Sequence, residues 1–342
     1  MKASQVFRRA TLAAAIAAAG FSSLAQANEI NLYTTREPGL VKPLLDAYTA
    51  KTGVKVNTVF LKDGLPERVA SEGDKSPADV LMAVDINALV DMQEKGVTQP
   101  IKSAALEAAV PANLRDANGN WFALSMRART LYTVKTGGPA SFTYEELADP
   151  KYKGKVCIRA GQHPYNTALI AHMIVKDGEA KTEQWLRGVK ANLARKAGGG
   201  DREVARDIVG GLCDIGPANS YYVGLMRTGA GGPDQQKWGD GINVVLPTFA
   251  KGGTHVNVSG AAIAKHSPNK DNAVKLLEYL VSDEAQAIYA KANFEYPVKK
   301  GAAVDPVIAK LGTLNVDATP LTEIAKHRKA ASVLVDKVGF DQ

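Results

Sequence analysis

Short apolar segments typical of strands alternate with longer segments typical of helices along most of the chain, and this alternation limits the fold more than any other feature. In the N-terminal half, strand-like runs at 29–35, 54–61 and 78–84 are followed by helix-like runs at 40–53, 65–74 and 85–96. Parallel strands need crossovers of about this length, and the crossover helices cover both faces of the sheet. The sequence therefore predicts an α/β fold built on a mostly parallel sheet.

The same alternation continues to the C-terminus and indicates a second lobe. Strand-like runs lie at 127–135, 154–160, 212–216, 242–249 and 254–265, and helix-like runs at 166–178, 182–196, 198–211 and 271–294. We interpret 127–135 as a strand that crosses between lobes and 242–249 as the segment that leads back. This predicts lobe one from residues 28–126 with about 250–295, lobe two from 127–249 with about 296–342, and a cleft between them.

The first 27 residues have the pattern of an export signal. Basic residues at 2, 8 and 9 precede an apolar run over 10–21, and the small-residue sequence AQA at 25–27 favours cleavage after Ala27. The apolar run is too short for a permanent transmembrane helix, so we expect no stable membrane insertion. The pattern predicts a periplasmic protein, and one arginine pair is too little to favour the Tat route over the Sec route.

Composition and cysteine content exclude some function classes. Loss of the three basic leader residues lowers the formal charge from +7 to about +4, and no arginine-rich tract with interleaved aromatics occurs, so we expect no nucleic-acid partner. Cys157 and Cys213 are the only cysteines, an even number for an oxidising compartment, which predicts a disulfide; two free buried thiols are the alternative. Without a CxxC or HxxxH motif, a zinc site is not expected.

Polar and aromatic residues follow the strands predicted in lobe two. In an open α/β sheet, ligands bind beyond the carboxyl ends of the strands. Tyr165 follows one such strand, and Tyr221 and Tyr222 follow another. Cys157 lies eight residues before Tyr165, and Cys213 lies eight before Tyr221. If the cysteines are bonded, the two tyrosine corners should face the same point.

Three converging phenol groups would suit a hard, highly charged cation. Phenolate is an anionic oxygen ligand, and a trivalent ion can displace its proton on binding. Three phenolates balance one ferric ion and leave octahedral positions for other oxygen donors, such as a small anion. Arg36, at the facing corner of lobe one, is the natural counter-charge for that anion, with Arg127 and Arg129 as further candidates.

Plainer interpretations of these residues stay open. The tyrosine pair could be a packing contact, Arg36 a solvated loop charge, and His163 a structural residue. Glu37 could bind the metal or repel the anion. Asn219, two residues before Tyr221, could support the site from behind.

The same residues resemble a known family. The segments NLYTTREPGLV, DPKYKGKVCIRAGQHPYNTAL, GGGDREVARDIVGGLCDIGPANSYYVGLM and THVNVSGAAIAKHSPNKDNAVKLLEYLVS are similar to the periplasmic ferric-iron-binding proteins of bacterial ABC transporters. The resemblance implies a type II periplasmic-binding-protein fold, with two α/β lobes, a hinge of crossing strands and an interlobe cleft. It implies a monomer that binds Fe³⁺ and delivers it to an ABC permease and its ATPase, without enzymatic turnover.

The resemblance also implies roles for individual residues. It makes Tyr165, Tyr221 and Tyr222 the iron ligands. Some members of the family place a histidine, or a histidine followed by a tyrosine, where this chain has Glu37 and Pro38. Because proline cannot bind a metal, the chain is more similar to the subgroup that uses three tyrosines plus carbonate or bicarbonate, with an arginine at the position of Arg36 holding the anion.

Two other functions fit parts of the sequence. A periplasmic receptor for a small organic or oxyanion ligand would use the same aromatic and arginine side chains. A secreted metal-dependent hydrolase or oxidase would need catalytic groups, but the sequence contains no GxSxG or HExxH motif.

Overall fold

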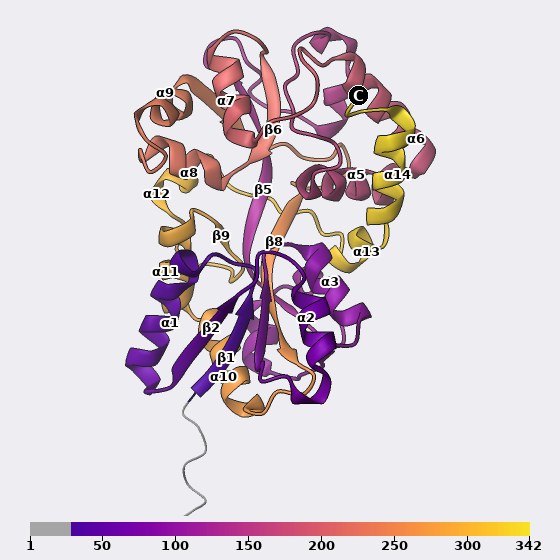
Figure 1. Cartoon of the computed structure of the whole chain (residues 1–342). Helices are drawn as coiled ribbons and strands as arrows, with labels where there is room; N and C mark the ends of the chain where they lie inside the picture. The colour runs from indigo at the N-terminus through magenta and orange to yellow at the C-terminus, as the bar shows by residue number, and fades with distance from the viewer. Residues whose placement is uncertain (1–28) are drawn as a thin grey trace, which may run out of the picture.

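The computed structural model describes residues 29–342, which form two α/β lobes joined by long strands (Figure 1). The chain begins in the lobe drawn at the bottom and ends in the lobe drawn at the top. The predicted export signal, residues 1–27, lies outside the described residues. No helix in the described part of the chain is long and apolar enough to cross a membrane.

The strands are β1 (Glu29–Thr34), β2 (Lys55–Phe60), β3 (Val80–Ala83), β4 (Thr98–Gln99), β5 (Phe122–Val134), β6 (Ile215–Asn219), β7 (Ile242–Val245), β8 (Val256–Ala264) and β9 (Tyr296–Pro297). The α-helices are α1 (Pro38–Thr52), α2 (Leu65–Glu72), α3 (Ile86–Glu94), α4 (Ala104–Ala109), α5 (Pro164–Asp177), α6 (Glu179–Ala191), α7 (Asp201–Val209), α8 (Tyr221–Arg227), α9 (Pro233–Gly241), α10 (Lys270–Leu280), α11 (Asp283–Asn293), α12 (Pro306–Ala309), α13 (Leu321–Lys326) and α14 (Arg328–Val338). Short 3₁₀ helices lie at Gly73–Lys75, Ala112–Leu114, Tyr144–Ala148 and Pro150–Tyr152.

The sheet of the first lobe is parallel only in part, so the prediction of a mostly parallel sheet is wrong: β8 pairs antiparallel with β3, β4 and β5. β1 pairs in parallel with β2 on one side and with β3 on the other. All four residues of β3 are buried, because helices cover both faces of the sheet. α1 and α11 lie on one side of this sheet, and α2 and α3 lie on the other (Figure 1).

β5 and β8 connect the lobes. The first half of β5, Phe122 to Ala128, pairs antiparallel with β8, and the second half, Arg129 to Val134, pairs with β6 and β7. The prediction of a crossing strand at 127–135 is therefore confirmed, although β5 starts at Phe122. Residues 242–249 lie in the second lobe, where β7 pairs with the second half of β5, and the chain then returns to the first lobe through β8.

The predicted strand at 154–160 is also absent. Within it only Val156 forms isolated bridges, to Leu193 and to Ile215. The amide of Cys157 donates to the carbonyl of Ile215 at 3.0 Å, and the next bond of a parallel ladder would need an N–H at Pro217. Proline has none, so the pairing stops after one bridge. The neighbouring strand β6 accordingly begins at Ile215 and not at Leu212.

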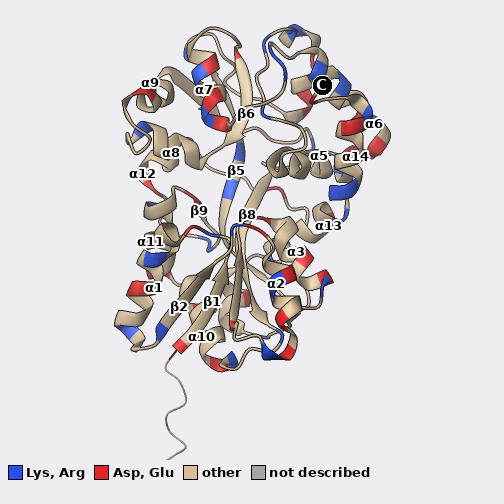
Figure 2. Cartoon of the chain, in the orientation of Figure 1, with Lys and Arg blue, Asp and Glu red and all other residues tan. Residues whose placement is uncertain are grey.

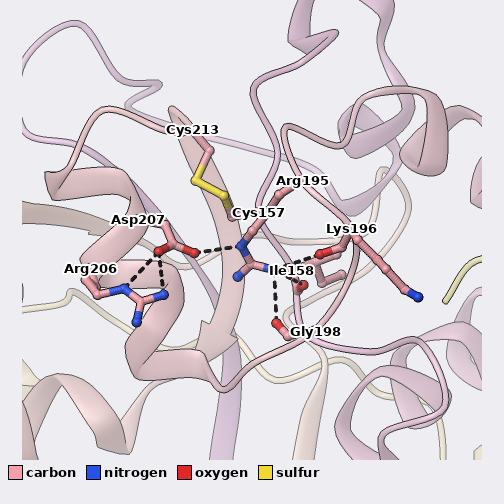
Figure 3. Close-up of a disulfide and its surroundings, with 8 residues drawn as sticks. All are labelled: Cys157, Ile158, Arg195, Lys196, Gly198, Arg206, Asp207 and Cys213. Carbon is pink, nitrogen blue, oxygen red and sulfur yellow. Dashed lines mark hydrogen bonds and ion pairs between the residues drawn. A yellow bond between two sulfur atoms is a disulfide. The ribbon is translucent and has the colours of Figure 1, made fainter. Parts of the chain in front are cut away.

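The predicted disulfide is present in the structure and joins these two neighbouring segments (Figure 3). Cys157 and Cys213 are both buried, with Cα atoms 5.9 Å apart. Beside the disulfide, the carboxylate of Asp207 accepts hydrogen bonds from the guanidinium groups of Arg195 and Arg206. The bond thus fixes the segment before α5 against the segment before β6, close to the helices that carry the tyrosines.

Candidate metal centre

Three tyrosine side chains meet where two helices of the second lobe begin. Tyr165 is the second residue of α5, and Tyr221 and Tyr222 are the first two residues of α8. The hydroxyl oxygens of Tyr165 and Tyr221 lie 3.3 Å apart, and the ring centroids of Tyr221 and Tyr222 lie 4.1 Å apart. Neighbouring residues of a strand point to opposite faces, but successive helical residues differ by only about 100°. The helix start therefore allows Tyr221 and Tyr222 to face the same side.

A buried ionic network ties the two tyrosine corners together. Arg129 on β5 donates to Asp201 Oδ2 at 2.7 Å and to Asn166 Oδ1 at 2.7 Å, and Asn166 follows Tyr165 in the chain. Asp201 also accepts the backbone N–H of Asn219 at 2.8 Å. Arg159 Nη1 lies 3.2 Å from the same carboxylate. Arg129 and Asn219, which the sequence places near the site, thus support the tyrosines from behind and do not line the cavity between the lobes.

His163 positions the first tyrosine. It precedes α5, and its Nδ1 accepts the backbone N–H of Tyr165 at 3.2 Å. Its ring packs edge-on against the ring of Tyr165, with centroids 4.5 Å apart. Burial, followed by the positive charge of Arg159, lowers the pKa of His163 to about 4. A neutral imidazole at this place caps the helix and holds the backbone that carries Tyr165.

Residues of both lobes line a cavity of about 380 Å³ in front of the tyrosines. Its walls include the three tyrosines with Arg202 and Leu225 from the second lobe. They also include Thr35, Arg36, Glu37, Leu40, Val84, Arg127, Ala292, Asn293 and Glu295, which belong to the first lobe and the crossing segments. The basic stretch in the middle of β5, which contains Arg127 and Arg129, lies at the junction of the lobes (Figure 2).

Arg36 faces this cavity but already has an ionic partner. Its Nη2 lies 2.5 Å from Glu295 Oε1, and the two side chains are only 10% and 2% exposed. The guanidinium also lies over the ring of Tyr289, 5.3 Å from its centroid. Within residues 29–342, the buried Nε of Arg36 has no hydrogen-bond partner. Burial alone would lower the pKa of Arg36, but the charge of Glu295 outweighs it and raises that pKa.

Arg127 is the second buried cation of this wall. Its Nη1 donates to Ser259 Oγ at 2.8 Å and lies 3.7 Å from Glu295 Oε1. Its Nη2 donates to the carbonyl oxygen of Val84. Glu37, in contrast, is exposed at the cavity mouth.

The phenol groups of Tyr221 and Tyr222 are held in their neutral form when no cation is near. Burial, and next the neighbouring Tyr165, raises the pKa of Tyr221 well above its usual value. Burial also raises the pKa of Tyr222, again with Tyr165 as the next cause. Ionising these groups therefore needs a strong nearby positive charge. No group of three histidine, cysteine, aspartate or glutamate side chains that could hold a metal occurs in the described residues. The tyrosine oxygens are accordingly the donors to consider.

Sequence patterns did not indicate Glu295, Asp201 or Arg202. Glu295 lies two residues after the end of α11, next to a segment where the sequence shows only an apolar helix pattern. Asp201 and Arg202 begin α7 after a glycine-rich turn, and such residues are usually solvated. A glycine-rich turn before a helix was the one available signal, and it could have drawn attention to this helix start.

Known proteins are similar to this chain over most of its length. Residues 75–316 match a family model described as bacterial extracellular solute-binding protein. Iron uptake protein A1 of Synechocystis sp. is 40% identical over 315 residues, which cover 91% of this chain and 87% of that protein.

Two solved structures share the whole fold. The Bordetella ferric binding protein superimposes with a TM-score of 0.90 at 66% identity, covering 92% of this chain and 100% of that chain. A Trichodesmium protein solved in complex with iron and citrate ligands superimposes with a TM-score of 0.87 at 41% identity, covering 91% of this chain and 99% of that chain. The two-lobed architecture described above is thus the type II substrate-binding fold that these ferric-binding proteins share.

Proposed function

The chain belongs to the bacterial extracellular solute-binding protein family, among its ferric-iron-binding members, and from this membership we propose that it is a periplasmic receptor for ferric iron. The ion binds in the cavity between the lobes, where Tyr165, Tyr221 and Tyr222 supply three oxygen ligands. The reaction is binding and release, without chemical turnover.

The convergence of three phenol groups is the observation that carries the proposal. Small hard cations bind oxygen ligands at about 2 Å, so two ligands at right angles lie roughly 3 Å apart. The hydroxyl oxygens of Tyr165 and Tyr221 are already 3.3 Å apart, so little movement brings both onto one ion. Because burial raises the pKa of Tyr221 and Tyr222, a trivalent cation can ionise them far better than a divalent one.

A small anion completes the coordination in this proposal. Three phenolates balance Fe³⁺ and occupy three of six octahedral positions. Carbonate or bicarbonate supplies further oxygen ligands to the iron and is held by Arg36 on the opposite wall of the cavity. The buried Nε of Arg36 has no hydrogen-bond partner among the described residues. A guanidinium can bind such a planar anion through two parallel hydrogen bonds.

Loading brings the lobes together, because the ligands lie on one lobe and the anion-binding arginine on the other. The lobes that move in this proposal are residues 28–126 with about 250–295, and 127–249 with about 296–342. An ABC permease and its ATPase then take up the iron. The leader at 1–27 directs export of the chain to the periplasm, where the protein binds iron that enters from outside the cell.

Visible absorption tests the proposal. The chelator-stripped mature protein is titrated with ferric ion, once with bicarbonate and once in bicarbonate-free buffer. We expect an orange-red band, from charge transfer between phenolate and iron, that saturates at one iron per chain. We expect bicarbonate to change its position or the affinity, because the anion shares the coordination sphere.

A colourless titration would overturn the ferric site. The tyrosines and arginines of the cavity would then fit a receptor for a small organic or oxyanion ligand. A visible band whose position and iron affinity do not change with bicarbonate would support the tyrosine site but contradict the proposed bound anion.

A further inference from the structure

The ion pair between Arg36 and Glu295 limits the charge that this cavity can offer to an anion. The pair is buried: the distance from Nη2 to Oε1 is 2.5 Å, and the Glu295 side chain is 2% exposed. The hydroxyl of Ser125 also donates to Glu295, and Arg127 Nη1 lies 3.7 Å from it. The carboxylate thus lies between the two arginines of the wall that faces the tyrosines.

The backbone around Glu295 is arranged to bury this carboxylate. The preceding residue, Phe294, has a φ of 56°, a left-handed conformation that is rare for an aromatic residue and persists only where the surroundings hold it. The residues that follow, Tyr296 and Pro297, form β9 and pair with β5. Between the end of α11 and β9 the chain therefore turns so that Glu295 points inward.

These three groups set the charge of the buried part of the wall; Glu37, which also lines the cavity, is exposed at its mouth. Arg36 and Arg127 each contribute one positive charge, and Glu295 contributes one negative charge, which leaves +1. Burial acts to raise the pKa of Glu295, but Arg36 and then Arg127 outweigh it, so the pKa is lowered and the carboxylate is ionised at neutral pH. Without it, two buried arginines would face the cavity with a combined charge of +2.

We propose that Glu295 determines which charge class of anion binds with the iron, by neutralising one of the two arginines that face the bound ion. A wall of charge +1 suits a compact anion of low charge such as bicarbonate, and a polyanion such as citrate gains little from its additional charges. This inference rests on the proposed ferric site but concerns only the opposite wall. Glu295 acts through Arg36 and is a positioning residue, not a metal ligand.

Anion selectivity is the property to measure, because a purely structural role would not change it. Calorimetric titration of the iron-free protein gives the dissociation constants for bicarbonate and for citrate, and thus their ratio. The variants are Glu295→Gln, which keeps the shape and removes the charge, and Glu284→Gln. Glu284 lies on α11, forms an exposed ion pair with Lys51 and does not line the cavity. Its replacement changes the total charge of the protein by the same amount as Glu295→Gln but leaves the charge of the cavity wall unchanged.

In Glu295→Gln, we expect the ratio to shift toward citrate by at least about tenfold, because charge complementarity in a desolvated site discriminates strongly. In Glu284→Gln, we expect the wild-type ratio. A folded Glu295→Gln protein with the wild-type ratio would overturn the inference. Ferric titration of the same samples keeps the two proposals apart: absence of the visible band in wild type rejects the ferric site, whereas the anion ratio is measured without iron.

Circular dichroism shows whether Glu295→Gln folds. If it does not fold, a second variant, Arg127→Gln, tests the same inference. Arg127→Gln lowers the charge of the wall from +1 to zero and should shift the ratio the other way, against citrate, by a similar factor. An unchanged ratio in Arg127→Gln would equally contradict the inference.

Discussion

Each tyrosine of the candidate site lies at a helix start, and burial raises the pKa of Tyr221 and Tyr222, so these two phenols stay neutral until a cation arrives. Tyr221 is the most affected of them, because its hydroxyl is 3.3 Å from that of Tyr165 and both would be negative together. Ionisation and metal binding are therefore coupled: the ion supplies the positive charge that allows neighbouring phenolates to coexist.

Replacing Tyr222 by phenylalanine tests the contribution of one oxygen. The ring and its packing on Tyr221 stay, so we expect the stability of the iron-free protein to change by no more than about 0.5 kcal/mol. Ferric affinity should fall by more than about 100-fold, since a lost ligand costs more than a lost supporting contact. Competition against a chelator of known affinity measures this.

Tyr152→Phe is the matched control, since Tyr152 packs on Phe142 and does not line the cavity. Equal ferric affinity of Tyr222→Phe and the control would mean that Tyr222 is a packing residue.

At the level of single residues, the convergence of Tyr165 and Tyr221 could be predicted from the sequence, whereas the position of Glu295 could not. Tyr165 and Tyr221 follow segments joined by a disulfide at equal spacing, so their convergence depends on local rules. Glu295 meets Arg36 across 259 positions of sequence, through a left-handed turn at a phenylalanine that no propensity rule favours.

Among the elements, α8 matters most, because it carries two of the three tyrosines. Its Gly224 allows close contact with Phe294: a Cβ built at Gly224 would lie 2.2 Å from Cγ of that ring. The contact joins the tyrosine helix of the second lobe to the segment that holds Glu295. The absence of a side chain at Gly224 thus sets the distance between the two walls of the cavity.

Gly224→Ala should therefore disturb both walls. The added methyl group meets the Phe294 ring near its base, where rotation cannot move it away, so α8 has to shift. We expect a loss of about 1–3 kcal/mol in the free energy of unfolding, as for other overpacked sites, together with weaker ferric binding. Denaturant unfolding and the visible titration measure the two effects.

Gly39→Ala in α1 is the control for stability, because within residues 29–342 the added methyl group meets no atom within 4 Å beyond its chain neighbours and its own helix backbone. A Gly224→Ala protein as stable as Gly39→Ala, with unchanged iron binding, would show that the contact with Phe294 does not set the distance between the walls.

Secondary-structure elements could be predicted where local sequence patterns determine them. The predictions failed where pairing between distant segments determines whether a strand forms. The parallel strands of the first lobe follow from their apolar pattern. The segment 154–160 has the same pattern but is not a strand, because Pro217 in its partner lacks the N–H that the ladder needs.

For the whole molecule, a buried histidine pair near the hinge should control stability at acid pH. The Nδ1 atoms of His172 and His255 lie 3.0 Å apart, and His172 Nε2 lies 3.2 Å from Asp317. Burial lowers the pKa of His172 and, further, that of His255, where the next causes are His172 and Arg129. Lys176 acts in the same direction on His172, whereas Asp317 opposes the shift for both.

The sign of the pH effect follows from the lowered pKa values. Below pH of about 6.5 the unfolded histidines bind protons and the folded ones do not, so stability is full above that pH and falls as the pH drops toward the folded pKa. We expect a loss of up to about 1.4 kcal/mol per pH unit for each such histidine. Burial also lowers the pKa of His163, to about 4, so His163 contributes in the same window.

Denaturant unfolding of the iron-free protein at pH 7.5, 6.5 and 5.5 measures this dependence. His172→Gln should have a shallower slope than wild type, by about 1 kcal/mol per pH unit. His266→Gln, at an exposed position, should keep the wild-type slope. If His172→Gln and wild type lose stability in parallel, His172 titrates normally in the folded protein.

The crossing strands explain why one cavity can use residues from distant parts of the chain. β5 pairs with β8 in one half and with β6 in the other, and β9 pairs with the half of β5 that also pairs with β8. Arg127 and Glu295 lie on or beside these crossing segments, whereas the tyrosines lie on helices of the second lobe. Relative motion of the lobes would thus change the distance between the phenol groups and the Arg36–Glu295 pair.

Crystallography of the iron-loaded protein at the iron absorption edge tests the central claim most directly. The account predicts one anomalous peak in the interlobe cavity, about 2 Å from the phenol oxygens of Tyr165, Tyr221 and Tyr222. A peak bound by fewer than three of these oxygens, or located outside the cavity, would contradict it.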